Sequence, residues 1–336
     1  MKFPLFSFLL VLLFACNEKE LPNASVAFYN VENLFDTEND KHTNDEQYTP
    51  KGDKRWDDKK YQTKLENLSK VINEIADGKA PTFLGVCEIE NKTVLQDLVK
   101  QSLIKSQNYG IVHQESPDER GIDVAFLYRK DVFSVKKLDV YQPDLKEYND
   151  KTRDILHVEG QTVNGETLHF IINHWPSRGE GRAKSEPKRI SAAVSLNGIK
   201  NSILEENENA KIIVMGDFND EPSNKSISET LAVSCSESVT ESNQLYNAFC
   251  DLEKEDIGSY RYRSYWDMLD QIMVSKSLLK DSNGLHYMSN SASIKAEPWM
   301  IQTGKYEGFP LRTFGGNNYQ AGYSDHFPVY IQLGLK

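Results

Sequence analysis

Acidic, amide and histidine side chains follow directly after several short apolar runs of this sequence. In the clearest example, an apolar run at residues 212–215 is followed by Gly216 and then by Asp217 and Asn219. A carboxylate and an amide placed in this way can orient a water molecule and accept its proton. They can equally close an Asx turn at the end of a strand. This segment alone leaves both interpretations open.

Other apolar runs carry similar polar side chains. A charged residue in a buried strand costs free energy unless it is paired or coordinates a metal ion. One such residue could be structural, but a whole set indicates a functional site. Asn30 and Glu32 are two residues apart, so a regular strand would place them on one face. The remaining members of the set are Glu88, Asn173, His174, Asp270, Asp325 and His326.

The elements that must position these residues are mostly strands. Runs rich in Val, Ile, Phe and Tyr predict strands at 25–31, 82–89, 123–129, 154–163, 166–175, 211–218, 269–275 and 326–333. Apolar residues at three- and four-residue steps predict helices near 65–75 and 94–104, the second capped by Thr93. A third helix is predicted at 185–206, with Ser185 as N-cap and Pro187 in its first turn.

The order of these elements favours an α+β fold. Strands and helices do not alternate strictly, so a doubly wound parallel sheet fits poorly, whereas two packed sheets with helices on their outer faces fit well. No linker, repeat or low-complexity block divides the chain. We therefore expect one domain over residues 25–336 and a monomer.

Composition limits the class of protein. The chain has 336 residues, of which 39% are hydrophobic and 10% aromatic, enough for a globular core and too many for a disordered chain. The 39 Lys and Arg against 50 Asp and Glu give a formal net charge of −11. This balance argues against a protein that coats nucleic acid through a basic surface. It does not exclude one that binds phosphates locally or through metal ions.

The amino-terminal segment reads as an export signal. Lys2 precedes an apolar run at residues 3–14, which is too short to span a bilayer and fits a secretory signal. The sequence before Cys16 resembles the lipobox of bacterial lipoproteins. This resemblance implies a signal peptide at 1–15, a lipidated Cys16 with a tether at 16–24, and an outer-membrane or secreted protein of the cell envelope that contacts the membrane only through its lipid. Cleavage by ordinary signal peptidase is the alternative.

Three further cysteines would then lie in an oxidising compartment. Cys235 and Cys250 are close enough in sequence to form a disulfide, and Cys87 lies in an apolar run typical of a buried free thiol.

Read in order, these motifs resemble the endonuclease/exonuclease/phosphatase superfamily, the DNase I-like fold, over residues 26–331. The motifs are Asn30-Val-Glu32, Glu88, His174, Gly216-Asp217-Phe-Asn219, Asp270 and Ser324-Asp325-His326. The stretch at 29–36 is similar to a subgroup of secreted bacterial nucleases. The resemblance implies a four-layer α/β sandwich, in which two mixed sheets pack face to face between helices.

The resemblance also implies a metal site. Glu88 would be the principal ligand, with Asn30 and Glu32 as ligands or directly behind them, and Asp325 would complete the metal side. Oxygen donors of this kind suit Mg²⁺ or Mn²⁺, with Ca²⁺ as a further option.

The same resemblance assigns catalytic roles. Asp217 and Asn219 would orient and activate the attacking water. His326 would contact the phosphoryl oxygens or transfer a proton, held in one tautomer by Asp270. His174 would donate to a non-bridging oxygen from the other side.

Four more residues are assigned from their sequence surroundings. Asp123 is a candidate partner for His174, or else a turn cap. Arg153 resembles the family arginine that reaches the phosphate, with a surface salt bridge as the alternative. Asn173 would contact the phosphate beside His174. Arg178 opens a basic segment at 178–189, either a phosphate-binding rim or a solvated helix start.

These assignments predict a metal-dependent phosphodiester hydrolase, an extracytoplasmic endonuclease acting on DNA or RNA. The first alternative is a phosphatase or phosphodiesterase for nucleotides, inositol phosphates or lipid headgroups. The second is a surface-binding lipoprotein without catalysis. The segment at 260–266 alternates tyrosines with arginines, and we interpret it as a half-buried strand without a role in substrate binding.

Overall fold

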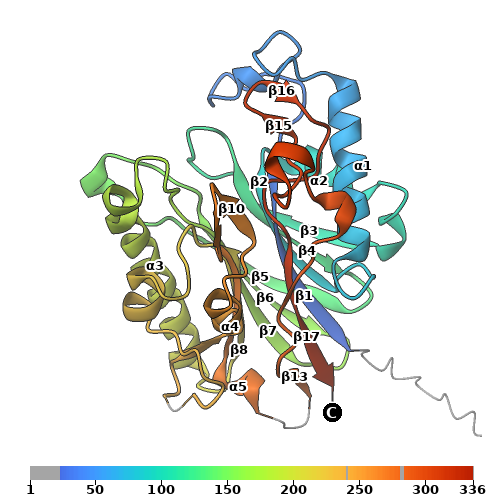
Figure 1. The fold of residues 1–336 in the computed structure, drawn as a ribbon. Helices are drawn as coiled ribbons and strands as arrows, with labels where there is room; N and C mark the ends of the chain where they lie inside the picture. Colours follow the sequence, from blue (N-terminus) through green and yellow to red (C-terminus); the bar gives the residue numbers. More distant parts are fainter. Residues whose placement is uncertain (1–22, 240, 281–283, 336) are drawn as a thin grey trace, which may run out of the picture.

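Two mixed β-sheets packed face to face form the centre of the protein, with helices outside both (Figure 1). The computed structural model describes residues 23–239, 241–280 and 284–335. The four layers confirm the predicted fold class.

The first sheet has the order β13-β17-β1-β2-β4-β3, with β14 paired to β17. Strands β1 and β2 are parallel and the other neighbours are antiparallel. The carboxyl ends of β1 and β2 therefore meet at one edge, which brings Asn30 close to Glu88. The strands are β1 Ala24–Leu34, β2 Phe83–Ile89, β3 Tyr109–His113, β4 Asp123–Arg129, β13 Leu285–Tyr287, β14 Ser293–Ile294 and β17 Val329–Leu335.

The second sheet has the order β5-β6-β7-β8-β12-β9. Strands β7 and β8 are parallel, whereas β12 runs antiparallel to β8. The start of β12 therefore lies beside the ends of β7 and β8, and Asp217 is register partner to both His174 and Asp270. The strands are β5 Phe133–Tyr141, β6 Ile155–Thr162, β7 Thr167–His174, β8 Lys211–Asp217, β9 Leu245–Asn247 and β12 Asp270–Ser275.

Three helices cover the sheets: α1 Asp58–Glu74 and α2 Lys92–Val99 pack on the first, and α3 Arg182–Glu206 packs on the second. Two expected helix starts are wrong. Asn91, not Thr93, caps α2, because the Asn91 side chain accepts hydrogen bonds from the Thr93 and Val94 amides. Helix α3 begins after Gly181, which places Ser185 inside the helix and Pro187 in its second turn.

Shorter elements connect these layers. The helices are α4 Cys250–Lys254 and α5 Lys276–Leu279, and the hairpins are β10 Tyr260–Tyr262 with β11 Tyr265–Asp267 and β15 Phe314–Gly315 with β16 Asn318–Tyr319. Short 3₁₀ turns lie at Glu46–Tyr48, Lys105–Gln107, Lys146–Tyr148, Pro298–Met300 and Gly304–Tyr306, and a π turn lies at Ser226–Thr230.

The largest core lies between the two sheets. Phe170 of β7 packs against Phe83 of β2 and Phe126 of β4, with ring centroids 4.7 and 4.6 Å apart. Burial of apolar side chains from both sheets is the main force that holds them together. Because this core is shared, the edges of the two sheets are fixed relative to one another.

Within the described residues, no helix is long and apolar enough to cross a membrane. The predicted signal peptide and Cys16 lie outside the described residues. The predicted disulfide between Cys235 and Cys250 is present, and Cys87 is a buried free thiol as expected.

The disulfide closes a loop with a sequence separation of 15 residues. We expect the double variant Cys235→Ala/Cys250→Ala to lose about 3 kcal/mol of unfolding free energy, because the reduced chain gains conformational freedom when unfolded. Urea unfolding measures this loss, and reductant should destabilise the wild-type protein by a similar amount. An unchanged unfolding midpoint in the double variant would contradict the expectation.

Candidate active site

Asp217 lies where the edges of the two sheets meet. Its Oδ2 accepts a hydrogen bond from Asn30 Nδ2 at 3.1 Å and lies 3.6 Å from His174 Nε2 and 3.9 Å from His326 Nε2. Its Oδ1 accepts from the Asn219 backbone amide at 2.9 Å. The structure thus brings together five residues that the sequence predicted, from strands β1, β7 and β8 and the segments that follow β8 and precede β17.

Irregular backbone at the strand ends shapes this site. Glu32, Asn33, Glu88 and Asn219 all have positive φ angles, between 49° and 62°. Such left-handed residues cost free energy outside glycine and often occur at functional sites. They interrupt the regular pairing of β1 with β2 after Asn30.

This irregularity overturns one expectation. Glu32 does not share a face with Asn30 in a regular strand; its carboxylate instead accepts a hydrogen bond from the Thr313 amide at 2.6 Å and lies 3.8 Å from Lys64 Nζ. Lys64 is 1% exposed, so Glu32 mainly neutralises a buried cation. Burial and the nearby Asp325 raise the pKa of Glu32 to about 7, against the opposing effect of Lys64.

Glu88 lies on the opposite side of Asn30 from Glu32. Its Oε1 accepts from Asn30 Nδ2 at 3.3 Å, and its Oε2 accepts from the Asn33 amide at 3.0 Å. Asn30 therefore links Glu88 to Asp217 through one amide group. The partly exposed carboxylate of Asp325 lies 3.7 Å from Arg312 Nη2.

His326 is held as predicted by Asp270. The distance from His326 Nδ1 to Asp270 Oδ2 is 2.6 Å, and Ser259 Oγ donates to the same carboxylate oxygen. Burial lowers the pKa of His326, but Asp270 and Asp217 outweigh it and leave this pKa well above the usual value. His326 is therefore a cation across the neutral pH range, and its Nε2 faces Asp217.

His174 has the opposite character. Burial, assisted by Arg153 and Arg120, lowers the pKa of His174 well below its usual value, so the imidazole is neutral. Its Nδ1 has no hydrogen-bond partner among the described residues. The proposed partner Asp123 is wrong, because its carboxylate is bound by His113 at 2.9 Å and by the Ser116 amide at 2.8 Å. His113 on the neighbouring strand β3 was not recognised from the sequence.

The chemistry of the oxygen donors fits a hard divalent cation on the Glu88 side of Asp217. Burial and Asp270 raise the pKa of Asp217 to about 6. A nearby cation would stabilise the ionised carboxylate and oppose this rise. Glu88 supplies carboxylate oxygens there, whereas Asn30 turns its Nδ2 toward Glu88 and Asp217 and its Oδ1 accepts from the Glu32 amide at 3.0 Å. Possible ligand atoms also converge at Cys87, His174 and Asp217. Burial raises the pKa of the Cys87 thiol well above its usual value, so it stays protonated and unsuited to a metal.

Asn173 and Arg153 both form hydrogen bonds to other groups of the protein. Asn173 is completely buried; its Oδ1 accepts from the Trp175 indole and its Nδ2 donates to the Ile171 carbonyl. It therefore has no group to offer a phosphate, and this expectation is wrong. Arg153 donates to Asp118 and to the Trp175 carbonyl, in a buried ion pair and not a surface one.

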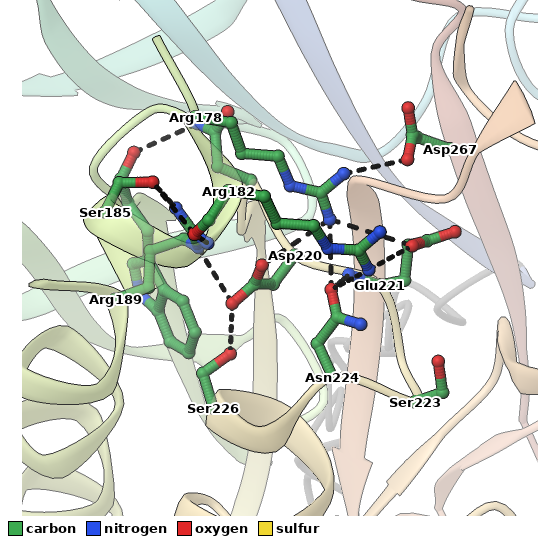
Figure 2. A network of polar contacts seen from close by, with 12 residues as sticks. Arg178, Arg182, Ser185, Arg189, Asp220, Glu221, Ser223, Asn224, Ser226 and Asp267 are labelled. Carbon is green, nitrogen blue, oxygen red and sulfur yellow. Dashed lines mark hydrogen bonds and ion pairs between the residues drawn. The ribbon is translucent and has the colours of Figure 1, made fainter. Parts of the chain in front are cut away.

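Arg178 and its segment form a paired network (Figure 2). Arg178 donates to Asp267 at 2.8 Å and to Asn224 at 3.0 Å, and Arg182 donates to Glu221 at 2.7 Å. The other cations of the segment also pair with acids, as Lys184 with Glu180, Lys188 with Asp150 and Glu180, and Arg189 with Asp220. The expected free phosphate-binding rim is therefore wrong, because acids after β8 and in neighbouring loops neutralise it.

This network holds the loop that carries Asn219. The next residue, Asp220, lies 2.8 Å from Arg189 Nε and accepts a hydrogen bond from Ser226 Oγ at 2.6 Å (Figure 2). Its backbone carbonyl accepts from Gln271 Nε2 at 2.7 Å. Asn219 Nδ2 donates to the Trp175 carbonyl at 3.0 Å. The sequence predicted none of these supporting contacts, because they join segments that are far apart along the chain.

We expect Asp220→Ala to lower the free energy of unfolding by about 3–5 kcal/mol, because it leaves the fully buried Arg189 without its carboxylate. The double variant Asp220→Leu/Arg189→Met should recover much of that loss, because no buried charge remains. Urea unfolding of the single and double variants measures the coupling. Asp251→Ala, which removes an exposed carboxylate from the pair with Lys254, is the control. Equal stability of Asp220→Ala and this control would refute the expectation.

Comparisons with known proteins agree with this geometry. The mannosyl-6-phosphatase of Bacteroides thetaiotaomicron VPI-5482 superposes with a TM-score of 0.57 at 17% identity, covering 93% of this chain and 100% of that one. TDP2 of D. rerio, complexed with a single-strand DNA product, gives 0.56 at 14% identity, with coverages of 93% and 99%. At these identities the likeness shows the fold.

No curated protein matches the sequence. The model of the Endonuclease/Exonuclease/phosphatase family, however, matches residues 25–334, nearly all of the part that the structure describes. The chain therefore belongs to the endonuclease/exonuclease/phosphatase family.

Proposed function

We propose that this protein is a metal-dependent phosphodiester hydrolase that acts on nucleic acid as an endonuclease. Membership of the family supports a phosphate-ester hydrolase. The observation that carries the proposal is the contact of one buried carboxylate, Asp217, with an amide and two histidines in different charge states. This combination can activate water and stabilise a phosphoryl group at the same place.

Each residue of the site has a separate role in the proposed hydrolysis. The Asp217 carboxylate accepts a proton from the attacking water, which Asn219 and Asn30 help to orient. The cationic His326, fixed by Asp270, donates its Nε2 proton toward a phosphoryl oxygen as negative charge builds up. His174 donates a hydrogen bond from the other side when its proton is on Nε2. Water adds its oxygen to phosphorus while the bond from phosphorus to the ester oxygen breaks. The ester oxygen leaves with the bonding electron pair and takes up a proton from solvent, which releases an alcohol.

Glu88, Asn30 and Asp325 would hold Mg²⁺ or Mn²⁺, with Ca²⁺ as a further option. The cation, when bound, supplies positive charge against the phosphoryl oxygens. Glu32 would not contact the cation directly and would support the ligands through its contacts with Lys64 and Thr313.

Two neighbours of the fold favour different substrates. One solved structure of TDP2 contains a single-strand DNA product, and another neighbour is described as a mannosyl-6-phosphatase. A phosphomonoesterase is therefore the second candidate.

We expect the purified protein to nick plasmid DNA or cleave RNA with Mg²⁺ and to lose this activity in chelator. Asp217→Asn and His326→Gln should each lower kcat about 100-fold or more, with circular dichroism unchanged. Asp251→Asn, a matched change at an exposed carboxylate, should have no effect. Release of phosphate from monoesters without nicking would contradict the nuclease assignment, and no turnover of any ester would favour a binding protein.

We also propose that the protein is a lipoprotein of the cell envelope, anchored through Cys16. The disulfide between Cys235 and Cys250 supports an oxidising compartment. We expect cells that express the protein to incorporate labelled palmitate into it, and Cys16→Ser to abolish the label. The control Cys87→Ser should retain it, because Cys87 is a buried thiol far along the chain. Labelling of Cys16→Ser at the wild-type level would exclude this anchor.

A further inference from the structure

A groove lies beside the catalytic histidine, formed by hairpin β10–β11 and the segment at 302–320. Its volume is about 440 Å³, within the usual range for small-ligand sites. The described residues that line it include three arginines and three tyrosines, and none of them is acidic. In a chain with a net charge of −11, such a lining is unusual and favours an anion.

Two residues that line the groove contact residues of the active site. The ring of Tyr260, at its inner end, packs on the imidazole of His326 with centroids 4.8 Å apart. Arg312, also in its lining, lies 3.7 Å from Asp325. A ligand in the groove would therefore lie close to His326, which contacts the phosphoryl group in the proposed reaction.

The arginines of the groove differ from those of the Arg178 segment. Arg261 stacks between Trp266 and Phe309, 5.2 and 4.6 Å from their ring centroids, and Arg263 stacks over Tyr262 at 5.2 Å. Among the described residues, neither forms a salt bridge, whereas every cation in residues 178–189 does. Arg261 Nη1 donates to the Glu307 backbone carbonyl at 3.4 Å. Stacking fixes the guanidinium planes, and the remaining N–H donors of Arg261 and Arg263 are available for phosphate.

The aromatic rings are also accessible. Tyr262 is 54% exposed and Tyr306 is 48% exposed, both in the groove lining. Exposed tyrosines next to arginines form a platform on which unpaired bases stack and to which phosphates bind. Bases within a duplex are already stacked, so a single strand is the better match.

A larger hollow in the described part of the chain is unsuited to the same ligand. It has a volume of about 850 Å³ and lies next to Glu90. Its lining is rich in acids, which would repel a polyanion. These acids are Asp36, Glu38, Asp40, Glu90, Glu115, Asp118 and Glu119.

We propose that this groove binds one nucleotide of a single-stranded nucleic acid, adjacent to the phosphodiester that is cleaved. The base stacks on Tyr262, and Arg261 and Arg263 bind the flanking phosphate. The proposal rests on the proposed nuclease function and extends it to the form of the substrate.

Binding can be tested without turnover. Fluorescence anisotropy would measure the Kd of the Asp217→Asn protein for a fluorescein-labelled oligothymidylate of about ten nucleotides. The same measurement would be made on double variants that add Tyr262→Ala or Arg263→Gln to Asp217→Asn. We expect Tyr262→Ala to weaken binding about fivefold or more through lost stacking. Arg263→Gln should weaken it and lower the slope of log Kd against log salt by about one. A strand of abasic residues should bind the Asp217→Asn protein as weakly as oligothymidylate binds the Tyr262→Ala variant.

The chain offers matched controls. Arg129→Gln removes a charge at the end of β4 away from the site, and Tyr148→Ala removes a tyrosine that is 36% exposed elsewhere. Both should bind the strand as the Asp217→Asn protein does. Equal binding by the groove variants and these controls would overturn the proposal. Stronger displacement of the strand by glucose 6-phosphate than by thymidine 5′-monophosphate would assign the groove to a sugar phosphate and would also overturn it.

These outcomes are separate from those for the proposed function. If the wild-type protein hydrolyses no phosphate ester, the proposed nuclease function fails, while the binding experiment still decides the groove. If it cleaves nucleic acid but the groove variants bind like the controls, only the groove assignment fails.

Discussion

A buried carboxylate at the junction of two sheets is the constraint on which the rest of this structure depends. Asp217 is 2% exposed, and a charge in that position requires compensation from several directions. Asn30 comes from one sheet, His174 from the other, and His326 from the segment before β17. The phenylalanine core between the sheets fixes these elements relative to one another, so the packing of apolar residues sets the geometry of the polar site.

The sequence predicted the fold and the central residues well, for a physical reason. Polar groups at the ends of apolar runs are costly unless they are paired, so Asn30, Glu88, His174, Asp217 and His326 could be recognised as a set, although each alone had a structural interpretation. Their supporting residues could not. Ser259 and Arg189 reach the site through contacts that span the chain, and neither has an unusual sequence environment.

The wrong assignments share a different cause. Regular alternation placed Glu32 beside Asn30, but a left-handed backbone at Glu32 interrupts the alternation and the pairing of β1 with β2. Chain neighbours suggested that Asn173 faces the phosphate, although a fully buried amide must satisfy its own hydrogen bonds and did so with Trp175. A count of cations suggested a basic rim at 178–189, where an acid, either Glu180 of the same segment or one from another segment, pairs with each cation. A local sequence pattern predicts where a residue lies in a strand or helix, but it does not predict which residues that side chain contacts.

For the same reason, the sequence indicated no role in substrate binding for the segment of tyrosines and arginines at 260–266. The alternation at 260–266 was expected to form one half-buried strand, but this segment forms two short strands joined by a turn, and Tyr262 is 54% exposed. Net charge was equally uninformative about where a polyanion could bind. Arg261 and Arg263 of the groove differ from the cations at 178–189 because no carboxylate pairs with them among the described residues, and only the three-dimensional arrangement decides that. The segment at 178–189 therefore supports the protein internally, whereas the segment at 260–266 forms an exposed surface near His326.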